Sequence, residues 1–286
     1  MDTKIYEKII SGDGTADIYK DESFARNYDA SAAAIFGKSM AHYNADIDFL
    51  LNLTTFSPRD FIVDLGCGTG IATQRLLERN SRRIIGVDSS EAMLQHAREK
   101  LPDVEFTTAS AEELSDVVSD ADKIVSTHVF QYISDPGKVL TEIYKALSPN
   151  GEYLFNVMVK TPNEPIYRHV FRVLEAAIDD ELGKKIKLPE LKGFEPKYDR
   201  AAIEAMARRP GFVLARYEEK PVVHAEEHVR AIHEQLLTAA EIMMAATSSG
   251  EPTKRMLRNA RERLHNLDFS HVVAGKEAYV CLRKPC

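Results

Sequence analysis

Glycine recurs at every second position in the segment Asp64-Leu65-Gly66-Cys67-Gly68-Thr69-Gly70, directly after the apolar run Phe61-Ile62-Val63. An apolar run followed by closely spaced glycines predicts a buried strand and then a tight turn. Because glycine has no Cβ atom, such a turn lets the backbone approach a ligand closely. Asp64, two positions before the first glycine, suits a ligand with a positively charged ammonium group and would repel a phosphate. The segment therefore predicts a site for a nucleotide-like ligand that carries an ammonium group.

A dinucleotide site is the main alternative for these glycines. Its fingerprint is G-x-G-x-x-G or G-x-G-x-x-A, in which the last small residue allows close packing of helix against strand. Gly66 and Gly68 fit the first two positions, but Ile71 stands at the third and Gly70 comes one residue early. The spacing therefore does not support the pyrophosphate seat of a dinucleotide site.

A second acid, Asp88, ends the next apolar run of the chain. A carboxylate at the end of a strand beside a glycine turn can accept hydrogen bonds from both hydroxyls of a ribose. Ser89 or Ser90 then caps the following helix, and Glu91 suits the positive end of its dipole. This pattern predicts a second wall of the same site.

Strands and helices alternate along the first half of the chain. The predicted strands are 61–65, 83–88, 104–108, 123–126 and 152–159, and the helices between them are 71–79, 91–100 and 135–147, with a tight turn at 148–151. A helical pattern over 23–53 precedes them, further strands are expected at 212–217 and 221–224, and the segments 272–273 and 277–282 are expected to close the chain as a strand or hairpin. This alternation predicts an α/β fold with a doubly wound, mostly parallel sheet.

Two long helical segments interrupt the alternation. We expect an arm at 1–22, a core at 23–159, a first helical cap at 160–198, a core helix and strand at 199–224, a second helical cap at 225–267 and a last core strand at 268–286. Both insertions follow late strands, and in an open α/β sheet such loops lie at the ligand-binding edge. The insertions are therefore predicted to cover the ligand site.

The motifs, taken in this order, resemble those of the class I S-adenosylmethionine-dependent methyltransferases over about residues 23–159. Asp64–Gly70 is similar to the first motif of the family, Asp88 to the acid that ends the second strand, and Ser89–Leu94 to the segment that walls the adenine. Ser110-Ala111-Glu112 stands where the family usually has Asp-Ala-Glu, so a hydroxyl replaces a carboxylate there. The resemblance implies a Rossmann-like fold with a seven-stranded sheet, S-adenosylmethionine as cofactor and S-adenosylhomocysteine as product.

The resemblance also implies which residues bind the cofactor. Met93 would form an apolar lid on the adenine, and Tyr28, in a segment similar to the aromatic cover of the family, would lie over the methionine end. The predicted cofactor-binding residues are Tyr28, Asp64, Gly66, Cys67, Gly68, Gly70, Asp88, Ser89, Met93, Ser110, Ala111, Thr127 and His128.

Methyl transfer from a sulfonium consumes positive charge, so positioning and exclusion of water supply much of the catalysis. A general base is needed only where the nucleophile arrives protonated. His128, Gln131 and Tyr132 follow the fourth strand and are the candidate catalytic residues, with His128 either accepting that proton or lining the cofactor.

The candidate substrate-binding residues lie in the caps: Tyr167, Arg168, Arg172 and His233. Arg168 and Arg172 share a helix face, which suits a substrate carboxylate, although a charged solvent-facing surface gives the same pattern. His224 and His228 are four residues apart, but a solvent-exposed face explains them better than a metal site, and we expect no metal.

Composition restricts the partners and the compartment. The formal net charge is −7 and the pI about 5.8, which disfavours a broad basic surface for nucleic acid. The Asn/Asp-Pro-Pro-Tyr/Phe motif of enzymes that methylate base or glutamine nitrogens is absent after the fourth strand. Three cysteines without metal-ligand spacing suit a reducing compartment. With no apolar signal segment or membrane-length run, a cytoplasmic protein with a small-molecule substrate is expected.

The predicted function is methyl transfer from S-adenosylmethionine to an O, N or C nucleophile of a small organic molecule, such as a carboxylic acid or a natural-product intermediate. One alternative is a protein that binds the same cofactor and catalyses a non-methylating reaction such as a cyclisation. Another is a dinucleotide-dependent oxidoreductase.

Overall fold

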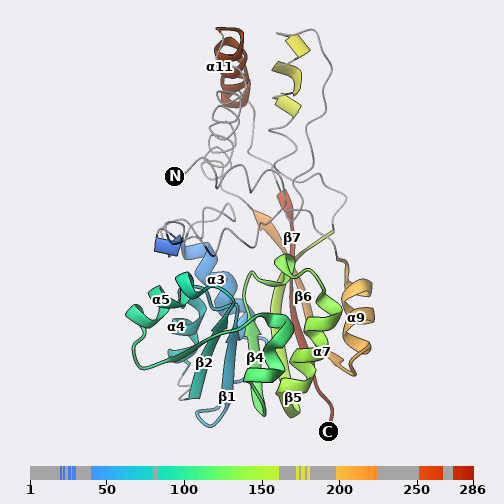
Figure 1. Ribbon diagram of the computed structural model, residues 1–286. Helices are drawn as coiled ribbons and strands as arrows, with labels where there is room; N and C mark the ends of the chain where they lie inside the picture. The colour runs from blue at the N-terminus through green and yellow to red at the C-terminus, as the bar shows by residue number, and fades with distance from the viewer. Residues whose placement is uncertain are drawn as a thin grey trace.

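Short apolar strands organise the chain into one sheet (Figure 1). The computed structural model describes residues 20, 22, 25–26, 28–29, 40–79, 83–160, 172–173, 175–177, 179–180, 198–223, 251–266 and 273–286. The strands are β1 (Phe61–Leu65), β2 (Arg83–Asp88), β3 (Glu105–Thr108), β4 (Ala121–Ser126), β5 (Leu147–Val159), β6 (Val213–Val223) and β7 (Val273–Arg283). They form a seven-stranded sheet in the order β3-β2-β1-β4-β5-β7-β6.

The first five strands pair in parallel, and β7 lies antiparallel between β5 and β6. All five residues of β1 are buried, as expected for a parallel strand covered on both faces. The predicted α/β fold with a mostly parallel, seven-stranded sheet is therefore confirmed.

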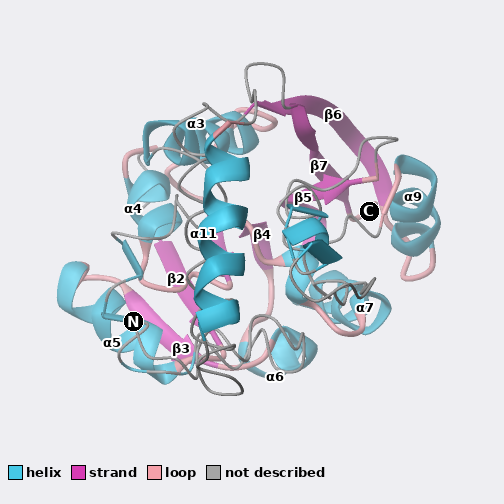
Figure 2. Cartoon of the chain, turned by 90° about the horizontal axis from the view of Figure 1, so that it is seen from above, coloured by secondary structure: helices cyan, strands magenta, loops and turns pink. Residues whose placement is uncertain are grey.

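Helices cover both faces of the sheet. On one face lie α3 (Met40–Leu51), α4 (Ile71–Leu77) and α5 (Glu91–Lys100); on the other lie α6 (Leu114–Val117), α7 (Pro136–Ala146) and α9 (Arg200–Arg208). Alternate residues of β1 point to opposite faces. Val63 packs in the cluster that holds α7 and α9, and Ile62 packs with α3 and α4. Figure 2 shows the two helix layers on either side of the sheet.

The late strands are longer than the sequence pattern predicts. β5 begins at Leu147, ahead of the expected residue 152, because the segment 147–151 pairs along β4 and the C-terminal segment: Asn150 N–H donates to the Lys284 carbonyl. β6 runs unbroken through Pro221. Proline is tolerated there because β6 is the edge strand of the sheet.

The N-terminal helical prediction agrees with the described residues up to Leu51, since Ala25, Arg26, Tyr28 and Asp29 are helical as well. The described helix α3 begins at Met40 and ends at Leu51, whereas the pattern predicted helix over 23–53. Between residues 23 and 39, the structure describes only Ala25, Arg26, Tyr28 and Asp29.

An ion pair connects the described parts of the two predicted caps. Helix α11 (Glu251–His265) lies above the carboxyl edge of the sheet in Figure 1, and Arg263 forms an ion pair with Asp180 from the first insertion. The boundaries of the caps stay a prediction. Among the described helices, none has both the length and the apolar character needed to cross a bilayer.

Candidate active site

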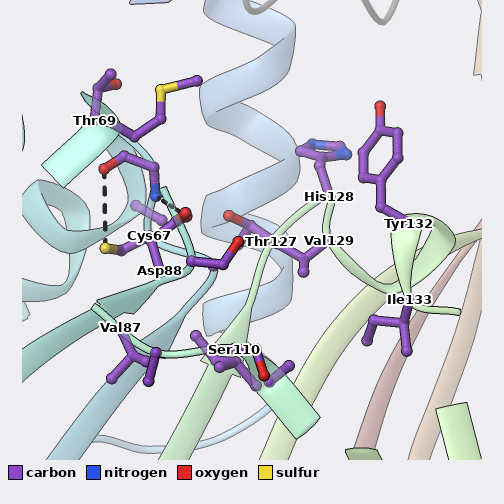
Figure 3. A pocket seen from close by; sticks show the side chains of 18 of the residues that line it. Cys67, Thr69, Val87, Asp88, Ser110, Thr127, His128, Val129, Tyr132 and Ile133 are labelled. Atoms are coloured by element: carbon purple, nitrogen blue, oxygen red, sulfur yellow. Dashed lines mark hydrogen bonds between the residues drawn. The ribbon is translucent and has the colours of Figure 1, made fainter. Parts of the chain in front are cut away.

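A cavity of about 240 Å³ lies at the carboxyl ends of β1, β2 and β4 (Figure 3). In an α/β sheet this edge binds ligands, because the loops that follow the parallel strands meet there. One end of the cavity is built by the glycine turn after β1 and by Asp88, and the other by the segment after β4. Its lining residues are Tyr28, Tyr43, Leu65, Gly66, Cys67, Gly68, Thr69, Ile71, Ala72, Val87, Asp88, Ser89, Met93, Ala109, Ser110, Ala111, Glu112, Thr127, His128, Val129, Tyr132, Ile133 and Ser134.

The glycine turn adopts a backbone that favours glycine. Gly66 and Gly68 have φ of 73° and 52°, in the left-handed region. A Cβ atom on Gly66 would lie 2.4 Å from Cγ2 of Val129, whereas a Cβ atom on Gly68 would meet no atom within 4 Å. Gly66 is therefore needed for close packing, and Gly68 leaves open space on the cavity side.

We expect Gly66→Ala to lower the free energy of unfolding by about 2–5 kcal/mol, because an overpacking cost adds to the cost of a left-handed residue. Gly68→Ala is the matched control: it has the conformational cost of about 1–2 kcal/mol but no clash. Urea denaturation measures both. Equal losses in the two variants would show that the Val129 contact is unimportant, and Val129→Ala should relieve part of the Gly66→Ala loss.

Asp88 connects the glycine turn to the next helix. Its carboxylate accepts hydrogen bonds from the backbone N–H groups of Gly68 (2.9 Å) and Ser90 (2.8 Å). Burial raises the pKa of this carboxyl above its ordinary value, although the backbone donors partly offset the effect. Ser90, and not Ser89, caps α5, because its hydroxyl accepts from the Met93 N–H. Ser89 is left to line the cavity.

Asp64 lies behind the glycine turn. Its side chain is fully buried and does not line the cavity. The Thr73 hydroxyl donates to Oδ2 at 2.6 Å, and Oδ1 has no hydrogen-bond partner among the described residues. Burial raises the pKa of this carboxyl to about 7, and the nearby charge of Asp88 adds to the shift. Gly70, the last glycine of the turn, is also absent from the lining.

The remaining predicted cofactor residues line the cavity: Cys67, Met93, Ser110, Ala111, Thr127, His128 and Tyr28. The Cys67 thiol is buried, which raises its pKa and keeps it protonated. Met93, a residue of α5, is almost fully buried. The Ser110 hydroxyl donates to Glu113 at 3.2 Å, an exposed contact that leaves its oxygen available as an acceptor.

His128 is held in a left-handed conformation with φ of 56°. Its backbone N–H donates to Oδ1 of Asn156 at 2.8 Å, and its carbonyl accepts from Nε2 of Gln131 at 2.8 Å. Tyr132 lines the cavity beside His128, as Figure 3 shows, whereas Gln131 does not line it. Of the three candidate catalytic residues, Gln131 thus supports the loop and the other two face the ligand space.

Asn156 and Glu277 were not among the residues singled out from the sequence. Asn156 Nδ2 donates to Oε1 of Glu277 at 2.5 Å and lies 3.1 Å from Nδ1 of His128, which in turn is 3.3 Å from the same carboxylate oxygen. No local pattern points to this contact, because β7 brings Glu277 to β5 from 121 positions along the chain.

The predicted substrate residues are only partly described. Tyr167, Arg168 and His233, together with His224 and His228, lie outside the described residues. Arg172 is described and exposed, and it is not among the residues that line the cavity.

Comparison with known proteins agrees with this geometry. Residues 62–151 match the family model of the methyltransferase domain. The chain is 36% identical over 111 residues to trans-aconitate 2-methyltransferase of Acidovorax sp. (strain JS42), covering 38% of this chain and 42% of the relative. It is 33% identical over 135 residues to malonyl-[acyl-carrier protein] O-methyltransferase of Acetivibrio thermocellus, covering 46% and 45%. The chain thus spans less than half the length of these curated relatives.

A solved structure shows the same fold over almost the whole chain. Phosphoethanolamine N-methyltransferase 2 of Haemonchus contortus, in complex with phosphomonomethylethanolamine and S-adenosylhomocysteine, superposes with a TM-score of 0.56. Its sequence is 17% identical, and the match covers 94% of this chain and 60% of that one. Sheet order and glycine turn agree with the family match: the chain has the fold of this methyltransferase structure, and residues 62–151 match the methyltransferase domain.

Proposed function

We propose that the chain binds S-adenosylmethionine in the cavity between the glycine turn and His128, and transfers its methyl group to a small organic molecule. The observation that carries the proposal is the pairing of an open glycine turn with a strand-end carboxylate: Gly68 presents backbone without side-chain obstruction, and Asp88 lies directly beside it. Their spacing suits a nucleoside, and the methyltransferase family match supports the choice of cofactor.

The described residues fit this cofactor in character. Asp88 would accept hydrogen bonds from the ribose hydroxyls, and Met93, Ala111 and Ser110 would enclose the adenine. Asp64, whose Oδ1 has no partner among the described residues, would when ionised place a negative charge behind the turn that favours the ammonium and sulfonium charges of the ligand. Tyr28 and Thr127 would complete the enclosure.

The cofactor would supply a methyl group on a positively charged sulfur, which is activated for displacement by a nucleophile. The protein contributes positioning and the exclusion of water. The cavity walls would hold the acceptor in line with the methyl–sulfur bond and keep water from competing as a nucleophile. Tyr43, Tyr132 and Ile133 form the end of the cavity available to the acceptor.

The acceptor is proposed to be a small molecule with an O, N or C nucleophile. The names of the two curated relatives indicate acids as acceptors, so a carboxylic acid is one candidate class. A natural-product intermediate with a hydroxyl or amine nucleophile is the other. A nucleic-acid acceptor is not proposed, since the chain is acidic overall.

A thermal-shift series tests the cofactor assignment. S-adenosylmethionine and S-adenosylhomocysteine, each at about 100-fold over their dissociation constants, should stabilise the chain by about 2.7 kcal/mol, whereas NAD should not. Stabilisation by NAD alone would favour an oxidoreductase. Accumulation of S-adenosylhomocysteine when the chain meets a metabolite pool would then distinguish methyl transfer from a non-methylating reaction.

A further inference from the structure

A buried group of polar side chains lies at the acceptor end of the cavity. His128 follows β4, Asn156 lies in the middle of β5, and Glu277 and Tyr279 share one face of β7. All four are almost inaccessible, with exposed fractions of 6%, 2%, 3% and 1%. Buried polar groups are costly unless they are paired, so this cluster is held by its own contacts.

The contacts favour one protonation state of the imidazole. Oε1 of Glu277 lies 3.3 Å from Nδ1 of His128 and accepts from Nδ2 of Asn156 at 2.5 Å, and the same amide nitrogen lies 3.1 Å from Nδ1 and 3.5 Å from Nε2. An unprotonated Nδ1 would turn its lone pair toward a carboxylate oxygen, which is repulsive in a buried setting. Because the Asn156 amide already donates to Glu277 over a shorter distance, we assign the proton to Nδ1 and the lone pair to Nε2.

The backbone of His128 is fixed as firmly as its ring. Its left-handed φ is sparsely populated for residues other than glycine, and the side chains of Asn156 and Gln131 hold the N–H and the carbonyl. Tyr43 stacks on the imidazole with ring centroids 4.7 Å apart. A strained residue held from several sides is a recurrent property of functional positions.

The ionisable groups around the imidazole come from several elements. Tyr28, Tyr43 and Asp46 come from the N-terminal side, Tyr132 from the loop after β4, and Glu277 and Tyr279 from β7. Burial raises the pKa of Tyr28, Tyr43 and Tyr279, so these phenols stay neutral. Tyr279 donates to Asp46 at 2.6 Å and lies 3.2 Å from Oε2 of Glu277.

We propose that His128 accepts the proton of the methyl acceptor through Nε2, and that Glu277 is a positioning residue that fixes the imidazole tautomer and stabilises the imidazolium. The inference rests on the proposed methyl transfer. In the step, a lone pair on the acceptor's oxygen or nitrogen forms the bond to the methyl carbon, and the carbon–sulfur bonding pair stays on sulfur. The proton of the acceptor moves to Nε2 and afterwards to solvent.

The charges of the cavity point to the same class of acceptor. Among the described residues that line it, His128 is the only one that can carry a positive charge, whereas Asp88 and Glu112 are acids. A carboxylate acceptor would arrive already ionised, would need no base and would find no arginine or lysine in the described lining. A neutral acceptor with a hydroxyl or amine proton would use His128 as its base and would not need a cationic partner in the lining.

The tautomer can be measured on the ligand-free chain. In protein labelled with ¹⁵N-histidine, long-range proton–nitrogen correlation spectra should show His128, assigned by its loss in His128→Gln, as the Nδ1–H tautomer. Glu277→Ala, which removes the acceptor, should shift the population toward Nε2–H, whereas Glu142→Gln, at another buried carboxylate, should not. A wild-type Nε2–H tautomer would overturn the proposal.

Kinetics give the second readout. With catechol and 4-nitrophenol as hydroxyl probes and trans-aconitate as a carboxylate probe, S-adenosylhomocysteine release should be confined to hydroxyl probes. His128→Gln should lower kcat by about 10²–10³-fold, with the KM for S-adenosylmethionine unchanged. Glu277→Gln, which keeps the shape and removes the charge, should lower kcat by about 10–100-fold. Methylation of trans-aconitate at a rate that His128→Gln leaves unchanged would overturn the proposal.

The proposed methyl transfer and the proposed role of His128 and Glu277 can be tested separately. Absence of S-adenosylhomocysteine binding would overturn the proposed function while leaving the tautomer measurement valid. Binding with an Nε2–H tautomer would keep the proposed function and remove the role of Glu277. If none of the probes reacts, the tautomer measurement alone decides between the two arrangements of His128.

Discussion

Asp88→Ala is expected to weaken the binding of S-adenosylhomocysteine by about a hundredfold or more. Hydrogen bonds to a charged acceptor contribute about 1.5–3 kcal/mol each, and a ribose would make two of them. The substitution also releases the backbone N–H groups of Gly68 and Ser90, which the carboxylate now holds. Both effects lower the affinity for S-adenosylhomocysteine, because the same carboxylate holds the glycine turn and would accept the ribose hydroxyls. Isothermal titration calorimetry measures the change.

Two comparisons make this result specific. Asp88→Asn keeps the shape and one acceptor oxygen, so its loss should be intermediate. Asp103→Ala removes an exposed carboxylate in the turn after α5 and should bind like the wild type. If Asp88→Ala bound S-adenosylhomocysteine with unchanged affinity, the ribose assignment would be wrong.

Cofactor affinity is expected to rise with pH, and Asp64 is the reason. Burial raises the pKa of this carboxyl to about 7 in the folded chain, above its ordinary value near 4. Between these values the folded state holds a proton that the unfolded state has released, so Asp64 makes folding less favourable as pH rises through this window. A cationic ligand would favour the ionised carboxylate of Asp64, so its binding is expected to release the proton that the folded chain holds there.

The size of the effect follows from the proton that binding must release. Below about pH 7, ionising Asp64 costs about 1.36 kcal/mol per pH unit, which is tenfold in affinity. We therefore expect the affinity for S-adenosylmethionine to rise by about 10–100-fold between about pH 5.5 and pH 7.5. Calorimetry in buffers of different ionisation enthalpy should detect the released proton.

Asp64→Asn is the matched variant, because the amide oxygen can still accept from Thr73 without titrating. Its affinity should change little over the same pH range, and its folding should be less sensitive to pH. An identical pH dependence in wild type and Asp64→Asn would assign the titration elsewhere, with Asp88 as the next group to test.

The cavity walls proposed to hold the cofactor could be located from the sequence because their residues are local. The glycine turn and Asp88 lie at the ends of neighbouring parallel strands, so the strand pattern alone brings them together. Asp64 shows the limit of this reasoning: it was predicted to bind the cofactor, and the pattern gives no indication that its side chain is fully buried, hydrogen-bonded to Thr73 and outside the cavity lining.

The acceptor end could not be predicted in the same way. His128 was singled out, but its partners Asn156 and Glu277 come from two antiparallel strands whose pairing is set by the tertiary fold. Neither residue stands in a local motif, and an acid within an apolar strand gives no indication of the partner it will meet. The left-handed backbone of His128 is likewise held by two side-chain hydrogen bonds that no local pattern predicts.

The position of β7 between β5 and β6 also affects when the sheet can form during synthesis. β5 and β6 both pair with β7, and β7 is synthesised after them. Until residues 273–283 have left the ribosome, one edge of β5 has no β7 to pair with, and unpaired strand edges attract other strands. Glu277 and Tyr279 reach His128 and Asp46 only in that last step. Nascent chains are thus expected to depend on chaperones late in translation, and to bring His128 and Glu277 together only when β7 docks.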